Sequence, residues 1–140
     1  MSLDNPATIV LLIDHIDKDR TYYAERIRFG LPDCQVLEAH DGRSGLELYK
    51  SQNVDCIVTE LTLPDMSGFE LLIEAIPHAS QPQVAVIILA GVASKTLADI
   101  ARINGAQAFL AKRITSGYEL VSVIQQAIAK VGPTRKDRQE

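Results

Sequence analysis

A glutamate at the end of an apolar segment is the residue with the clearest chemical potential in this sequence. Residues 55–59 are mainly apolar and β-branched, a pattern typical of a buried strand, and Glu60 follows them. A loop containing Pro64 and Gly68 comes next. In an open α/β sheet, the loops at the carboxyl ends of the strands form a crevice in which ligands bind. Glu60 is therefore predicted to lie where such a sheet carries its chemistry.

Other predicted strand ends also carry residues of interest. Asp14 and His15 follow the first apolar run, Ala90 lies at the end of the fourth, and Lys112 follows the fifth. If the strands are parallel in the order 2-1-3-4-5, the first and third strands flank the switch point at which ligands bind. We therefore expect Asp14, Glu60 and Lys112 to converge in one shallow pocket. This expectation depends on the fold, because sequence spacing alone does not bring these residues together.

The elements that must position these residues alternate in type along the chain. Short apolar runs, typical of buried parallel strands, alternate with segments of helical periodicity. The pattern predicts an α/β domain with a flavodoxin-like (βα)5 fold, in which helices cover both faces of a five-stranded parallel sheet. Strands are expected at 8–13, 35–38, 55–59, 84–89 and 108–111, and helices at 18–29, after the turn at 41–44, and at 69–76, 96–103 (with Ser94 as N-cap) and 118–131.

Length and composition fit one globular domain. The 140 residues can bury a single core, which is expected over 7–131, with a disordered or tag-like start at 1–6 and a polar tail or linker at 132–140. A net charge of −4 argues against non-specific binding of nucleic acid. No apolar run approaches the ~18 residues of a membrane span, so a cytoplasmic setting is expected. Cys34 and Cys56 are predicted to be buried free thiols in strands on opposite sides of the first strand.

The segment around Glu60 resembles the phosphoacceptor strand of bacterial response-regulator receiver domains, the CheY-like family. The family pattern is an apolar strand, an aspartate, three residues, a proline, three residues and a glycine. Pro64 and Gly68 occupy the expected places, whereas Glu60 replaces the acceptor aspartate. Lys112 matches the family lysine that pairs with the acceptor. The resemblance extends over about residues 7–131 and implies a receiver that has lost its reaction.

The resemblance also implies roles for the other positions of the pocket. Asp14 matches the first of two adjacent acids that hold Mg²⁺ in active receivers, but His15 replaces the second, and Mg²⁺ uses imidazole poorly. The backbone carbonyl of Thr62 would be a further ligand. A hydroxyl residue that binds the phosphoryl group is replaced by Ala90, which cannot donate a hydrogen bond. Phe109 matches the aromatic residue that rotates during activation.

These departures weaken one and the same reaction. Aspartyl phosphorylation needs a carboxylate at a set distance from a metal ion, and donors to the phosphoryl oxygens. Glu60 moves the carboxylate about 1.5 Å further into the pocket. A misplacement of this size can cost on the order of 100-fold in rate. We therefore predict no useful phosphotransfer, no enzymatic activity, and no cofactor beyond at most weak Mg²⁺ binding by Asp14, Glu60 and Thr62.

Three functions remain open at this level. The leading one is a non-enzymatic pseudo-receiver of a two-component (phosphorelay) pathway that acts through protein contacts. The alternative is a response regulator that accepts a phosphoryl group at the atypical acid Glu60. A flavodoxin-like domain that binds a cofactor or nucleotide is disfavoured, because no glycine-rich phosphate loop follows the first strand. Within the leading function, Glu60 either imitates a phosphorylated residue or forms a structural salt bridge with Lys112.

Contact-based signalling needs a surface. Receivers commonly use the face of the fourth helix, fifth strand and fifth helix, which here would meet a histidine kinase, an output domain, another regulator or a second copy of the chain. Val121 and Val123 widen the apolar stripe of the fifth helix, which supports this face. The fourth helix adds charged residues such as Arg102.

Three polar or aromatic features receive structural interpretations. His15 is expected to be a solvent-facing loop residue, with a position between Asp14 and Glu60 as the alternative. Asp65 is expected to be a turn residue that lies away from Lys112. Of Tyr22 and Tyr23, one is expected in the core and the other half-exposed.

Overall fold

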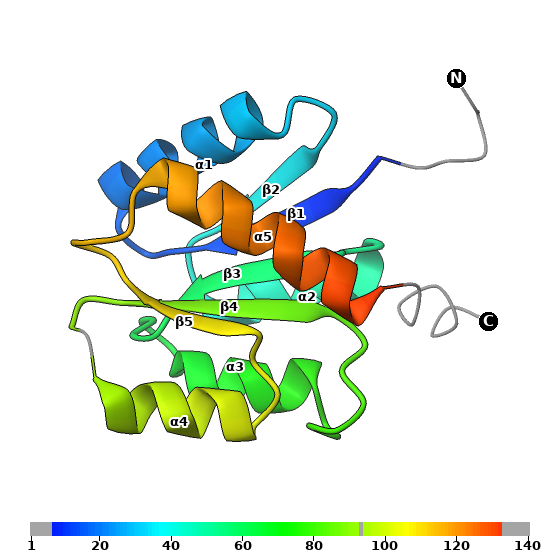
Figure 1. Ribbon diagram of the computed structural model, residues 1–140, viewed down its shortest axis with the longest axis vertical. Coiled ribbons are helices and arrows are strands. Elements are labelled where there is room, and N and C mark those ends of the chain that lie inside the picture. Colours follow the sequence, from blue (N-terminus) through cyan, green and yellow to red (C-terminus); the bar gives the residue numbers. More distant parts are fainter. Residues whose placement is uncertain (1–6, 93, 133–140) are drawn as a thin grey trace.

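Apolar strands and amphipathic helices alternate along the chain and assemble into one parallel sheet of order β2-β1-β3-β4-β5 (Figure 1). The computed structural model describes residues 7–92 and 94–132, so the predictions for 1–6 and 133–140 lie outside the described residues. The strands are β1 (Ile9–Ile13), β2 (Gln35–Ala39), β3 (Cys56–Glu60), β4 (Ala85–Ala90) and β5 (Ala108–Ala111). The helices are α1 (Asp17–Gly30), α2 (Gly42–Ser51), α3 (Gly68–Ala75), α4 (Lys95–Ile103) and α5 (Gly117–Val131).

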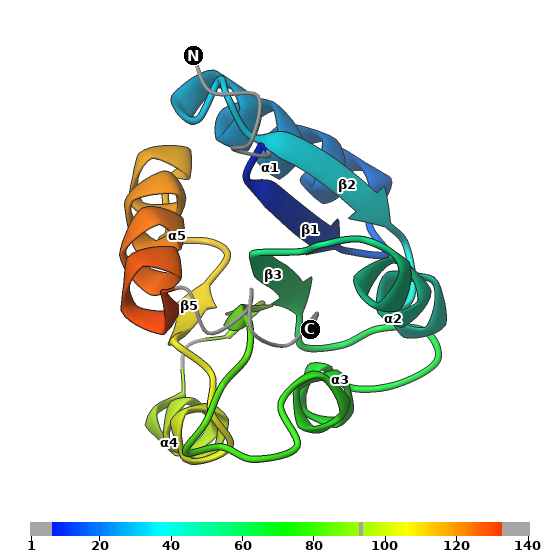
Figure 2. The same ribbon diagram turned by 90° about the vertical axis from the view of Figure 1, so that its right-hand side faces the viewer.

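The central strands are apolar throughout because helices cover both faces of the sheet. Every residue of β3 and β4 is buried, whereas the edge strands β2 and β5 are only partly covered. Along β4, Val86 and Ile88 join one core cluster, and Ile87 and Leu89 join the other. Helices α2, α3 and α4 cover the first cluster and α1 and α5 the second (Figure 2). The sheet is therefore a rigid support with its strand ends free for a site.

Side chains that cap the helices fix where the loops end. Asp41, Ser67 and Ser94 each accept a hydrogen bond from a backbone amide in the first turn of α2, α3 and α4. Ser116 and Glu119 form a capping box at the start of α5. Helix α1 has no such side-chain cap, because Ile16 occupies the N-cap position. The predicted cap at Ser94 is confirmed.

The predicted fold class and strand order are confirmed, with small differences at element boundaries. Glu60 is the last residue of β3, in register with Leu89, rather than the residue after the strand. Asp17 is the first residue of α1 rather than the residue before it. Cys34 precedes β2 and is only half-buried, so its predicted burial within a strand is wrong, whereas Cys56 is buried; both thiols are free as expected.

Candidate functional site

Three strand ends deliver charged side chains to one place at the switch point of the sheet. The ammonium nitrogen of Lys112 lies 2.7 Å from Asp14 Oδ2 and 3.4 Å from Glu60 Oε1. Asp14 is fully buried, and the side chains of Glu60 and Lys112 are 6 % and 12 % exposed. The structure thus brings together the three residues that were expected to converge. Their charges balance in part, because a buried ammonium lies between buried carboxylates.

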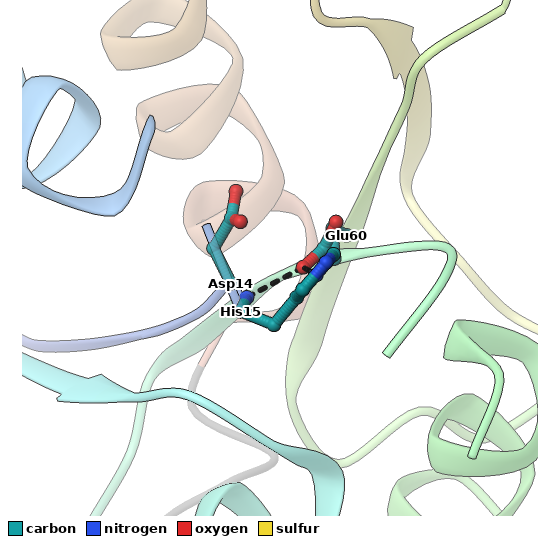
Figure 3. A group of neighbouring side chains, drawn as sticks. All are labelled: Asp14, His15 and Glu60. Atoms are coloured by element: carbon teal, nitrogen blue, oxygen red, sulfur yellow. Dashed lines mark hydrogen bonds and ion pairs between the residues drawn. The ribbon is translucent and has the colours of Figure 1, made fainter. Parts of the chain in front are cut away.

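His15 holds the other oxygen of Glu60. Its backbone amide donates to Glu60 Oε2 at 2.5 Å, and its ring nitrogen Nδ1 also contacts that oxygen (Figure 3). The side chain of His15 is 41 % exposed, as expected of a solvent-facing loop residue, but its ring also contacts Glu60, as in the alternative. The cause is local: Asp14 Oδ1 accepts the amide of Ile16, and the turn this makes points the intervening amide of His15 at Glu60.

Asp19 is a member of this cluster that the sequence reasoning missed. Its Oδ2 accepts a hydrogen bond from Lys112 Nζ at 2.9 Å. It lies in the first turn of α1, directly after the loop that carries Asp14 and His15. Its position could have been predicted from the sequence, because a carboxylate in the first turn of a helix that follows β1 must lie close to the end of that strand. Lys112 therefore contacts three carboxylates.

The loop after β3 is held close to Glu60 by a glycine. A Cβ atom on Gly68 would lie 2.9 Å from the backbone oxygen of Glu60, and the Gly68 amide donates to the Leu61 carbonyl at 2.6 Å. A larger residue would push this loop away from the site. The glycine at this place in the sequence pattern thus fixes the position of the β3–α3 loop over the acid.

Asp65 does more than the turn role assigned to it. Its two carboxylate oxygens accept the backbone amides of Gly42 and Arg43 at 2.8 and 2.9 Å, at the N-terminus of α2. Burial alone would raise its pKa, but these two hydrogen bonds hold the pKa below its usual range. Asp65 thus joins the β3–α3 loop to α2. As expected, it is not among the acids that contact Lys112.

Only some of the remaining predicted positions line the pocket. A hollow of about 480 Å³ is lined by Thr62, Gly91 and Arg113, together with the cluster residues His15, Asp19, Glu60 and Lys112. Ala90 is 3 % exposed, and its methyl group offers no hydrogen bond. Phe109 is half-buried on β5 and packs against the core cluster under α2, α3 and α4. Of the two tyrosines, Tyr23 is buried and Tyr22 is half-exposed, as expected.

The three charged residues influence one another's protonation. Burial raises the pKa of Asp14, although Lys112 opposes the shift. Burial acts in the same direction on Glu60, but hydrogen bonds from the amide and ring of His15, together with the charge of Lys112, hold its pKa below the usual value. Burial disfavours the charge of Lys112, yet its bonds to Asp14 and Asp19 raise its pKa. The lysine is thus charged throughout the neutral range.

We expect the free energy of unfolding to fall as the pH rises above about 10. Burial raises the pKa of Tyr23, which donates to the backbone oxygen of Lys112, and the pKa of Lys112 is raised as well. In the folded state both groups keep protons that the unfolded chain loses near its ordinary pKa values of 10.0 and 10.5. The unfolded state then binds fewer protons, so stability is lost as the pH rises. Urea unfolding between about pH 8 and pH 11 measures how steeply the free energy of unfolding falls with pH. Tyr23→Phe and Lys112→Met should each make this fall less steep. An unchanged pH dependence in both variants would contradict the assignment of the effect to Tyr23 and Lys112.

The fold and the site together define a class of protein. A parallel sheet of this order, with an acidic cluster and a lysine at its switch point, is the flavodoxin-like arrangement of CheY-like domains. A family model for the response regulator receiver domain matches residues 10–125. The chain belongs to this family, whose members are signalling modules of two-component systems.

Individual relatives agree with this assignment. The nitrate/nitrite response regulator protein NarL of Escherichia coli K12 is 31 % identical over 130 residues, which are 92 % of this chain and 58 % of NarL. This chain therefore spans little more than half of that relative's length. A CheY-like receiver domain protein from Methanospirillum hungatei JF-1 has a similar structure, with a TM-score of 0.77, 21 % identity, and coverage of 94 % of this chain and 99 % of that chain. A receiver domain protein from Clostridium thermocellum is similar, with a TM-score of 0.71, 28 % identity, and coverage of 88 % and 95 %. Within residues 7–92 and 94–132, no helix is long and apolar enough to cross a membrane.

Proposed function

We propose that this receiver domain does not accept a phosphoryl group and acts through protein contacts, within or beside a two-component pathway. The observation that carries the proposal is the state of Glu60, whose two oxygens are both engaged. Oε1 pairs with Lys112, and Oε2 accepts from the amide of His15 and contacts its ring. A carboxylate held in this way is a poor nucleophile, because attack on phosphorus requires an oxygen that is free and in line with the leaving group.

The ligand set also fits Mg²⁺ poorly. Among the described residues, Asp14, His15 and Glu60 offer ligand atoms that lie within 4.8 Å of one another, and these are the group that could hold a metal ion. Mg²⁺ requires nearly octahedral oxygen ligands, and one atom of this set is an imidazole nitrogen. The ammonium of Lys112 already lies 2.7 Å from Asp14, where it neutralises the charge that would attract a cation. These residues support at most weak Mg²⁺ binding, and no step of the proposed function depends on the ion.

Within this proposal, Glu60 serves as a structural ion-pair partner rather than as a permanent imitation of phosphate. A phosphoryl group carries about −1.5 to −2 charge and three acceptor oxygens, whereas a glutamate has one charge and two oxygens. Ala90 removes a hydrogen bond worth roughly 1 kcal/mol. Changing the ratio of active to inactive conformation from 1:99 to 99:1 requires about 5.5 kcal/mol. Glu60 could therefore imitate phosphate only if the two conformations were already nearly equal in free energy.

A titration of the amide NMR spectrum tests the proposal. Mg²⁺ is added first, followed by beryllofluoride, which mimics a phosphoryl group on a carboxylate. We expect weak or no shifts at Asp14, Glu60 and Lys112, and none that spread to Ala90 or Phe109. Saturable shifts at millimolar Mg²⁺ that beryllofluoride then extends to α4 would mean that Glu60 accepts a phosphoryl-like ligand, and the alternative function would replace this one.

For the contacts themselves, we propose the face of α4, β5 and α5, with a second copy of the chain as one partner and a kinase, output domain or another regulator as others. Ile103 and Ile100 on α4 are 68 % and 38 % exposed, and Asp99 pairs with Arg102 at 2.9 Å beside them. The sequence argument from Val121 and Val123 is wrong, because Val121 packs against Gly30 of α1 and Val123 packs against the core cluster that α1 and α5 cover. The exposed Ile100 and Ile103 on α4 now provide the support for an apolar contact at this face.

Self-association through this face is tested by Ile103→Glu. A central apolar residue of an interface costs at least about tenfold in affinity when it is lost, and a buried charge adds to that cost. Sedimentation equilibrium should therefore show dimers of the unsubstituted chain that dissociate in Ile103→Glu. Ile73→Glu on α3, at a position that is 53 % exposed, is the matched control and should leave dimers intact. A chain that is monomeric at all concentrations would contradict self-association, and equal losses of dimer in both variants would contradict this choice of face.

A further inference from the structure

The donor atoms that fit Mg²⁺ poorly match a different class of metal ion. Asp14, His15 and Glu60 each offer one ligand atom, and these atoms lie within 4.8 Å of one another at the ends of β1 and β3 (Figure 3). Two of the side chains end in a carboxylate and the third in an imidazole. Zn²⁺ binds imidazole and carboxylate together, whereas Mg²⁺ takes oxygen ligands.

Asp14 carries a buried oxygen that the chain itself leaves unsatisfied. Asp14 is fully buried, and within the described residues its Oδ2 atom accepts no hydrogen bond. The Lys112 ammonium lies 2.7 Å from this oxygen as an ion-pair partner, but it directs its hydrogen bonds at Asp19 and Glu60. Buried polar atoms in proteins are nearly always satisfied by a hydrogen bond, a bound water or an ion. Oδ2 is therefore well placed to act as a metal ligand.

The charge of the cluster also favours a divalent cation. One buried ammonium, that of Lys112, contacts the three carboxylates of Asp14, Asp19 and Glu60. Arg113 borders the hollow as well, but it is exposed, so water and salt screen its charge. The carboxylates thus outnumber the buried cation that pairs with them, and Lys112 can stay in place when a second cation binds.

Coordination number separates Zn²⁺ from Mg²⁺ in this pocket. Zn²⁺ binds in tetrahedral geometry to three protein ligands and one water, whereas Mg²⁺ demands an octahedron and loses its waters reluctantly. The hollow of about 480 Å³ has space for the water. The ring nitrogen of His15 now contacts Glu60 directly, so the ring must turn to admit an ion between them. Because 41 % of the His15 side chain is exposed, the ring has space to turn.

We propose that Asp14, His15 and Glu60 form a Zn²⁺ site with one position open to water. An ion held there joins the loop after β1 to the end of β3. His15 in the place of an acid thus changes which metal the pocket selects, rather than only weakening its binding of Mg²⁺. This inference goes beyond the proposed function, with which it shares the poor fit to Mg²⁺, and no phosphoryl group enters it.

Calorimetric titration of the intact chain with Zn²⁺, and separately with Mg²⁺, tests the proposal. We expect one Zn²⁺ per chain, bound at least about 100-fold more tightly than Mg²⁺, since imidazole suits Zn²⁺ and not Mg²⁺. The ring nitrogen resonances of His15 should shift on saturation with Zn²⁺. In His15→Gln the affinity for Zn²⁺ should fall at least about tenfold, because even the loss of an outer partner of a metal site costs that much. The partly exposed position lets this variant fold.

His40 provides the matched control. Its Nε2 atom lies 3.5 Å from Asp41 Oδ2, so it also pairs with a carboxylate, but its side chain is 69 % exposed. Within the described residues, His40 belongs to no group of three possible metal ligands. His40→Gln should therefore leave the affinity for Zn²⁺ unchanged.

A change of selectivity gives a second readout. In His15→Asp the affinity for Zn²⁺ should fall while the affinity for Mg²⁺ rises, a result that loss of folding cannot produce. The proposal is overturned if Zn²⁺ does not saturate, if it binds no more tightly than Mg²⁺, if His15→Gln keeps the full affinity, or if His40→Gln loses as much. Binding of neither ion would overturn the Zn²⁺ site alone, whereas saturable Mg²⁺ binding that beryllofluoride extends to α4 would overturn the proposed function.

Discussion

Replacing Lys112 with methionine should lower the free energy of unfolding by about 3–5 kcal/mol at neutral pH. The ammonium is the shared partner of Asp14, Asp19 and Glu60, at 2.7, 2.9 and 3.4 Å. Asp14 is fully buried and the Glu60 side chain is 6 % exposed, so water cannot replace the lost charge. Methionine has a similar length and preserves the packing of the aliphatic part. The measured loss therefore reports uncompensated buried charge, and urea denaturation monitored by circular dichroism measures it.

Lys95 provides the matched control for this substitution. It also pairs with an aspartate, Asp99, at 3.5 Å, but its side chain is 92 % exposed. Lys95→Met should therefore change stability by about 0.5 kcal/mol or less, as exposed pairs within a helix do. Equal effects of the two substitutions would contradict the view that the buried cluster depends on Lys112.

The pH dependence of the Lys112→Met variant gives a further check on its cause. Burial already raises the pKa of Asp14 in the intact cluster, and removal of the ammonium raises it further. A carboxyl group with a raised pKa opposes folding when it is ionised, and this penalty disappears as the pH falls below its pKa in the unfolded chain. The difference in stability between the variant and the unsubstituted chain should shrink as the pH falls from 7 towards about 4.

The arrangement of the sheet could be predicted because its signal is spread over many residues. Runs such as 84–89 are apolar at every position, which only a strand covered on both faces requires, and β4 indeed spans Ala85–Ala90. Ser94 was recognised as a cap by its own chemistry, and it accepts the amide of Leu97. Convergence of Asp14, Glu60 and Lys112 then followed from topology alone. Each of these predictions depends on the backbone path more than on any particular side-chain rotamer.

The details that could not be predicted depend on loop conformation. The sequence does not say that the turn after β1 aims the amide of His15 at Glu60, nor that Asp65 reaches across to the amides of α2. Periodicity placed Val121 beside the core stripe of α5 but could not tell which neighbour it meets, and Gly30 of α1 is that neighbour. Asp19 was missed because a charged residue in the first turn of a helix is also common as an exposed residue. The partners of side chains across loops cannot be predicted from the sequence pattern, since several rotamers satisfy the same pattern.

Phosphoryl acceptance should be restored by three substitutions made together, His15→Asp, Glu60→Asp and Ala90→Thr. Glu60→Asp withdraws the carboxylate by about 1.5 Å, away from the place where the His15 amide and ring now hold it. His15→Asp replaces an imidazole with the hard oxygen ligand that Mg²⁺ prefers. Ala90→Thr adds a hydroxyl that can donate to the phosphoryl oxygens. Lys112 is already in place, 2.7 Å from Asp14.

We expect the triple variant, incubated with Mg²⁺ and acetyl phosphate, to be labelled at least on the order of 100-fold faster than the unsubstituted chain. Intact-mass spectrometry measures the labelled fraction. Glu60→Asp alone should remain almost inert, because the nucleophile, the metal ligands and the hydroxyl act on the same transition state and none suffices by itself. A triple variant with Glu60→Asn in place of Glu60→Asp keeps the other two changes without a nucleophile, and it should not be labelled.

The labelling rate and the beryllofluoride-induced shifts of the triple variant separate two reasons for which the natural site could fail to accept a phosphoryl group. If the residues at positions 15, 60 and 90 are the whole cause of this failure, the rest of the fold can still undergo the activating change. In the triple variant, beryllofluoride bound at position 60 should then also shift the resonances of Phe109. Labelling without such shifts would mean that the site has recovered its reaction while the coupling through position 90 and β5 has been lost. Labelling of the unsubstituted chain at a similar rate would show that Glu60 is an acceptor, because none of the three replaced groups could then be the barrier to phosphorylation.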